Sequence, residues 1–175
     1  MPRLLSAAAA AAILLAASPA TAHVELQVDK APAASSYKAV LMVPHGCAGA
    51  PTIALKVQIP DGVIGTKTMA KLGWKITVKT AKLAQPVEIE GETITEAVKE
   101  IDWTGGNLPD SLYDEFAFIA NLPDKPGTTL YFPAVQICAK GETRWIEIPA
   151  QGQSAEDLKA PSPSLTLGPK AAGSD

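Results

Sequence analysis

A histidine placed directly after a small-residue cleavage motif is the residue of this chain best suited to chemistry. His23 follows Ala20, Thr21 and Ala22, which form the Ala-x-Ala pattern at which signal peptides are cut. Cleavage before His23 leaves a chain whose first residue offers two metal donors, its α-amine and its imidazole Nδ1. Nitrogen donors in a flat arrangement, completed by carboxylate or water, suit Cu(II) best among the divalent ions. The sequence therefore predicts a chelating N-terminus that depends on cleavage at this point.

The first 22 residues have the pattern of a secretory signal peptide. Arg3 precedes an apolar run over residues 7–17, and small residues follow that run. The run is too short for a membrane anchor, because a spanning helix needs roughly 20 apolar residues. We expect residues 1–22 to be removed, and the mature protein to be periplasmic with no stable membrane anchor after processing.

Two cysteines, Cys47 and Cys138, lie in the exported part of the chain. In an oxidising compartment two cysteines most simply form one disulfide, and we expect that bond here. The alternative is a thiolate metal site that includes His45, the second histidine. His45 stands in a turn-forming segment, residues 43–47, where a histidine bonded to backbone or water is favoured over a metal ligand.

Composition argues against several classes of function. The 175 residues include 15 Lys and Arg against 18 Asp and Glu, a formal net charge of −3. A mildly acidic chain without a basic cluster is not typical of a nucleic-acid-binding protein. The sequence shows no Ser-His-Asp set, paired-carboxylate motif or phosphate-binding loop, so we expect no enzymatic activity.

Apolar residues alternate with polar ones over most of the mature chain, which indicates β-strands. Turn residues separate these segments, and short strands at this spacing are typical of an antiparallel sandwich. We predict an all-β, immunoglobulin-like antiparallel β-sandwich over residues 23–150. Residues 151–175 are rich in Ser, Pro and Gly, and we expect them to form a polar, partly disordered extension. The expected strands are 24–28, 38–43, 53–59, 74–78, 94–103, 116–120, 129–137 and 145–148.

One glutamate in this pattern has a second interpretation. With Phe116 and Phe118 facing one side of their strand, Glu115 and Ala117 face the other. A glutamate on the exposed face of a strand is the ordinary outcome. A carboxylate on that face is also a suitable partner for a metal held by His23.

Landmarks spread along the mature chain carry a resemblance to a known family. They are His23-Val24, Tyr37 through Val43-Pro44, Thr52 with Val57 and Ile59-Pro60, Gly73-Trp74, Tyr113 to Phe116, Leu122-Pro123, Gln136, and Gly141 with Trp145. In order and spacing the chain resembles the YcnI-like copper-binding proteins of bacteria. That resemblance implies a β-sandwich that binds one Cu(II) ion through a single-histidine brace. It makes His23 and Glu115 the ligands and packs Trp145 against the site; without the family, Trp145 would be expected in the core.

These features favour a periplasmic Cu(II)-binding protein that acts as a copper chaperone or buffer. Its expected partners are the copper ion and other periplasmic copper-handling proteins. An alternative from another class is a metal-independent, immunoglobulin-like interaction module. A copper oxidase is disfavoured. Oxidative polysaccharide-cleaving enzymes hold copper with a second histidine, whereas a carboxylate in that place favours Cu(II) over Cu(I) and makes the site harder to reduce.

Overall fold

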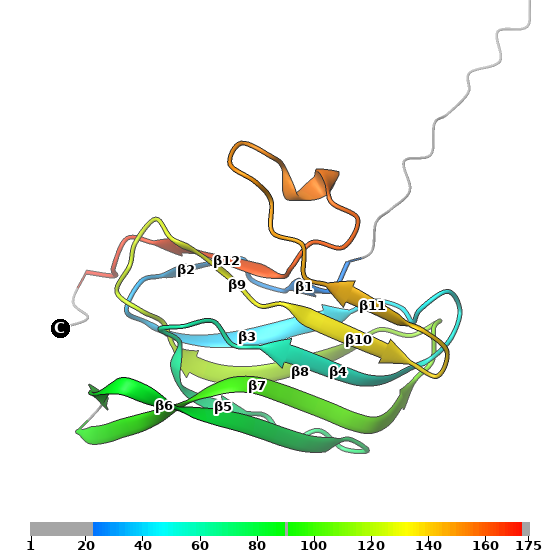
Figure 1. Ribbon diagram of the computed structural model, residues 1–175, viewed down its shortest axis with the longest axis horizontal. Coiled ribbons are helices and arrows are strands. Elements are labelled where there is room, and N and C mark those ends of the chain that lie inside the picture. Colours follow the sequence, from blue (N-terminus) through cyan, green and yellow to red (C-terminus); the bar gives the residue numbers. More distant parts are fainter. Residues whose placement is uncertain (1–22, 90, 173–175) are drawn as a thin grey trace, which may run out of the picture.

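The computed structural model describes residues 23–89 and 91–172, and nearly all of its regular elements are strands (Figure 1). The signal segment expected over residues 1–22 lies outside the described residues. Within the described part, no helix is long and apolar enough to cross a membrane. The elements are β1 (Glu25–Leu26), β2 (Lys30–Pro32), β3 (Ser36–Val43), β4 (Thr52–Gln58), β5 (Ile64–Thr68), β6 (Lys75–Ile89), β7 (Glu92–Leu108), β8 (Asp114–Asn121), β9 (Thr129–Tyr131), β10 (Ala134–Cys138), β11 (Glu142–Trp145), η1 (Ala155–Asp157) and β12 (Ser164–Gly168).

The strands form three sheets. A four-stranded sheet has the order β1-β3-β8-β5, and a five-stranded sheet has the order β11-β10-β4-β7-β6. A third sheet, β2-β12-β9, contains the parallel pair β2–β12, whereas the named strands otherwise pair antiparallel. The expected all-β antiparallel sandwich is therefore confirmed.

Period-two alternation builds the core. Leu41 pairs with Phe116 across β3 and β8, and Leu55 pairs with Trp103 across β4 and β7. All four side chains are fully buried and belong to one apolar cluster. Burial of side chains of this size contributes about 1.5–3 kcal/mol each, so these facing rows hold the sheets together and fix the register of the strands.

The C-terminal segment differs from the sequence prediction. Residues 164–168 do not lie in a disordered extension but form β12, which pairs with β2 on one side and β9 on the other. Leu165 and Leu167 are essentially inaccessible to solvent. Their alternation is a strand signal, but it is only one pair long and sits among Pro, Ser and Gly. The domain thus continues beyond residue 150 and includes the last described strand.

A second difference is that β7 continues to Leu108, beyond the strand expected over residues 94–103. Gly105 adopts a positive φ of 77°, so the strand bends without ending, a conformation that glycine adopts at little cost. Gly106 lies under Trp74, and a Cβ there would be 2.1 Å from the indole. Trp74 in turn packs edge-on to Phe116, with ring centroids 4.9 Å apart. The positive φ explains Gly105, and the close approach of the Trp74 indole explains Gly106.

Candidate metal centre

His23 lies immediately before β1, at the edge of the four-stranded sheet. Val24 and Leu26 point into the core, and β1 is held by pairing with Met42 and Leu41 of β3. The His23 side chain is only 9% exposed. Its imidazole packs on the indole of Trp145, with ring centroids 5.5 Å apart and planes tilted by 59°. The structure therefore brings together two of the three residues that the sequence analysis proposed for the site.

The two imidazole nitrogens have different surroundings. Nε2 is buried and has no hydrogen-bond partner among the residues that the structure describes. Nδ1 lies 3.7 Å from Oε1 of Glu25. Nδ1 is also the nitrogen that can chelate one ion together with the α-amine of the same residue. The nitrogen required for chelation thus faces a carboxylate, and the donor set fits a divalent metal that accepts nitrogen and oxygen.

Trp145 is fixed from behind by a buried amide. Its indole N–H donates to Oε1 of Gln136 at 3.0 Å. The Gln136 side-chain nitrogen donates to the backbone oxygen of His45 at 2.6 Å and to Oγ1 of Thr52 at 2.8 Å. Gln136 is only 1% exposed, and a buried amide is stable when its donors and acceptor are satisfied in this way. This network holds the indole against which His23 packs.

The disulfide expected from the sequence is present and lies beside this network. Cys47 and Cys138 are bonded, with their Cα atoms 5.9 Å apart. Because both sulfurs are in the disulfide, the alternative thiolate site is excluded. His45 Nδ1 lies 2.5 Å from the backbone oxygen of Gly46, as the interpretation of a turn histidine with a backbone partner predicts. His45 contributes its carbonyl, through Gln136, to the support of Trp145.

Glu115 is placed on β8, two strands away from β1. It pairs with Met42 of β3, and Met42 pairs with Glu25 of β1. These three residues therefore share the outward face of the sheet, as predicted for Glu115 from the inward Phe116. Two strand spacings put the Cα atoms of Glu25 and Glu115 about 10 Å apart. Among the described residues, no hydrogen bond or ion pair joins Glu115 to His23, and no three His, Cys, Asp or Glu side chains form a ready metal cluster.

An open hollow of about 730 Å³ adjoins β1 and is called the β1 hollow below. His23, Glu25 and Met42 line one side, and Glu156 and Pro161 line the other. The opposite side belongs to the segment between β11 and β12, which stands out from the body of the sandwich in Figure 1. Backbone hydrogen bonds close the base of that segment, from Ile146 N to Ala160 O at 3.1 Å and from Ser162 N to Glu147 O at 2.8 Å. The hollow thus has a second wall above β1.

Sequence reasoning did not single out Glu25, which lies beside the His23 imidazole, or Gln136, which holds the Trp145 indole. Glu25 was counted only as a polar position in an alternating strand, although the spacing His-x-Glu places both side chains on one face. Gln136 was noted only as a landmark of the resemblance. A polar residue between Ala134 and Cys138, on a strand whose alternate residues are buried, signals a buried hydrogen-bonded amide.

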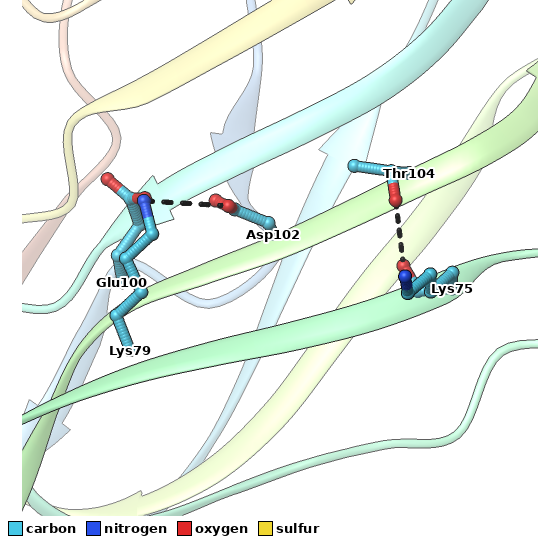
Figure 2. Close-up of polar contacts among 5 residues, drawn as sticks. All are labelled: Lys75, Lys79, Glu100, Asp102 and Thr104. Atoms are coloured by element: carbon cyan, nitrogen blue, oxygen red, sulfur yellow. Dashed lines mark hydrogen bonds and ion pairs between the residues drawn. The ribbon is translucent and has the colours of Figure 1, made fainter.

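A charged cluster on β6 and β7 is the other notable polar group (Figure 2). The Lys79 ammonium pairs with Glu100 and lies 3.7 Å from Asp102 Oδ2. The hydrogen bond from Lys79 lowers the pKa of Glu100, whereas burial, reinforced by the nearby Glu100 charge, raises the pKa of Asp102. Since Lys79 already pairs with both carboxylates across the two strands, we assign this cluster to cross-strand pairing rather than to ligand binding.

A family model for the "Domain of unknown function (DUF1775)" matches residues 23–167. The chain belongs to the DUF1775 family. The matched segment begins at His23 and reaches into β12, so the DUF1775 domain includes the strand that composition had placed outside the fold. No curated protein matches the chain.

A solved structure supports the architecture of this DUF1775 domain. It is described as an uncharacterized protein from Nocardia farcinica whose crystal structure reveals an immunoglobulin-like fold. The two are 25% identical, with a TM-score of 0.62, and the match covers 83% of this chain and 98% of the other. The predicted immunoglobulin-like fold is thereby confirmed.

Proposed function

We propose that this DUF1775 protein binds one Cu(II) ion through His23 after cleavage before that residue, and serves as a periplasmic copper chaperone or buffer. One observation carries the proposal: the His23 imidazole packs on Trp145 with Nδ1 turned towards a carboxylate. The amine and Nδ1 of His23 would be the nitrogen donors. Glu115 is the carboxylate ligand that the resemblance to YcnI-like proteins implies, and it shares the outward face of β1 and β3.

The surroundings of His23 support this role. Trp145 packs against the imidazole in a tilted arrangement, and its own orientation is held by Gln136. Groups that orient a ligand in this way typically change metal affinity by about 10–100-fold when they are removed. Oxygen ligands favour Cu(II) over Cu(I), which suits storage or delivery of the oxidised ion.

The test compares the chain beginning at His23 with the same chain whose α-amine at His23 is acetylated. We expect the first to bind one equivalent of Cu(II) in a calorimetric titration, and the second to bind much more weakly because its amine is an amide. His23→Ala should abolish the site, and Glu115→Gln tests the proposed carboxylate through affinity and electron spin resonance. Equal binding by the chain beginning at His23, the acetylated chain and His23→Ala would refute the proposal.

A metal-independent interaction module remains the second candidate, favoured by exposed apolar side chains at one end of the sandwich. Leu72 is fully exposed and Leu112 is 56% exposed. Their loops meet where Lys71 Nζ contacts Asp114 Oδ1 at 2.7 Å and the backbone oxygen of Glu115 at 2.8 Å. Under this alternative the chain beginning at His23 binds Cu(II) no more tightly than His23→Ala does.

A further inference from the structure

We propose that Glu25 is an oxygen ligand of the same ion, so that one metal is held by both ends of a His-Val-Glu segment. This inference rests on the proposed function and adds a ligand that belongs to β1 itself. It makes the N-terminal three residues a compact site, with Val24 as their anchor in the core.

Strand geometry places the two donors together. Residues two positions apart in an extended chain project from the same face. Val24, between them, is 1% exposed and points into the core, which turns His23 and Glu25 the other way. Pairing with Met42 fixes the backbone of Glu25. The sheet thus sets the face from which His23 and Glu25 project.

The distance between the donors is suited to one shared ion. His23 Nδ1 and Glu25 Oε1 are 3.7 Å apart, too far for a hydrogen bond between them. Metal–nitrogen and metal–oxygen bonds of about 2.0–2.2 Å put two ligand atoms about 3 Å apart when adjacent and about 4 Å apart when opposite. The observed separation lies within that range, so both atoms can contact one ion with only a small rotation of the carboxylate.

The Glu25 carboxylate is free to make that adjustment. The side chain is 58% exposed, against 9% for His23. In the described part of the chain, its only ionisable neighbour within ion-pair distance is His23. An exposed carboxylate beside a buried imidazole can contact an ion that enters from the β1 hollow, which Glu25 lines.

Glu25 is also nearer to the imidazole than Glu115 in this arrangement. Met42 separates the two glutamates across the sheet, and only Glu25 lies within 4 Å of a His23 nitrogen. Two nitrogen donors from His23 and two carboxylate oxygens would complete four positions around Cu(II), which favours about four donors near a plane. The inference therefore adds to the proposed role of Glu115 and does not replace it.

The experiment uses the chain beginning at His23 and compares Glu25→Gln, Glu25→Asp and Glu156→Gln. Glu156 lines the same hollow and Glu156→Gln removes the same charge, so it is a matched control for general electrostatic attraction. Affinity is measured by titration with CuCl2 against glycine as a competing chelator. Electron spin resonance of the Cu(II) form reports the ligand atoms, and circular dichroism checks the fold.

We expect Glu25→Gln to weaken Cu(II) binding by about tenfold or more and to change the spin-resonance spectrum, whereas Glu156→Gln stays within about threefold of the parent. Glu25→Asp keeps the charge on a shorter arm and should fall between them. If Glu25→Gln matches Glu156→Gln in affinity and keeps the parent spectrum, the role of Glu25 is refuted. If His23→Ala still fails to bind Cu(II) in that case, the proposed function stays intact. If His23→Ala binds Cu(II) like the parent, both the proposed function and the role of Glu25 are refuted.

Discussion

Removing the indole N–H of Trp145 tests whether the Gln136 network supports the candidate site. In Trp145→Phe, Gln136 Oε1 loses the donor that now lies at 3.0 Å. An unsatisfied buried acceptor costs about 1–3 kcal/mol, and the smaller ring loses apolar burial worth about 1 kcal/mol. We therefore expect the free energy of unfolding to fall by about 2–4 kcal/mol, measured by urea denaturation followed by circular dichroism.

A double-mutant cycle separates the hydrogen bond from the loss of volume. Gln136→Met keeps the length of the side chain and removes its bonds to Trp145, His45 and Thr52. Residues joined in one network show interaction energies of about 0.5–3 kcal/mol, whereas independent sites add to within about 0.5 kcal/mol. We expect the double variant with Trp145→Phe to be less destabilised than the sum of the single variants by at least 1 kcal/mol. Additive effects would show that Gln136 does not hold the indole, and would refute this account.

Three further predictions concern the disulfide, the metal and the charged cluster. Replacing Cys47 and Cys138 together by alanine removes a covalent link between residues 91 positions apart. The loop-entropy model predicts that the free energy of unfolding, measured by urea denaturation, falls by about 4–5 kcal/mol. A fall of less than about 1 kcal/mol would contradict that model. Because protons compete with metal for an amine and an imidazole, Cu(II) bound through His23 should be released as the pH falls from about 7 to about 5; constant affinity in that range would argue against these donors. Burial and the adjacent Glu100 raise the pKa of Asp102, so ionised Asp102 opposes folding at neutral pH and this penalty disappears as the pH falls through the raised pKa. Asp102→Asn should therefore raise the thermal midpoint at pH 7 by a few degrees at most. Glu100→Gln should lower it, because Lys79 lowers the pKa of Glu100 and the resulting stability is present at pH 7 and lost in acid. The opposite order of the two midpoints would refute the assignment of this cluster to cross-strand pairing.

Much of the fold was predictable because its strands are half-buried and alternate cleanly. The rows that include Leu41 and Phe116 are long enough for period two to be distinct from period 3.6. β12 was not recognised because Leu165 and Leu167 give a single alternation among turn-forming residues. Its stability comes from β2 and β9, which are distant in sequence, and such tertiary pairing leaves no local signal.

The site was predictable only in part, for a different reason. The disulfide followed from the number of cysteines and the expected compartment. Contact between His23 and Trp145 depends on how the edges of two sheets meet, which strand periodicity does not specify. The expectation that these two side chains meet came from the family resemblance. Glu25 could have been found from its spacing to His23 alone, because two residues of separation in a strand already place both on one face.

The pairing of β2 with β12 has a consequence for the order in which the molecule assembles. The backbone oxygen of Asp29, just before β2, accepts a hydrogen bond from Thr166 N at 2.8 Å, so β2 near the start of the described chain and β12 near its end are held by each other. Contacts between such distant parts of a chain form slowly, because a large loop must close first. Residues near the N-terminus therefore reach their final positions only after almost the whole chain is available. Binding of a metal at His23 would then report completed folding. In a refolding experiment, Cu(II) uptake should lag behind the formation of the β6–β7 hairpin.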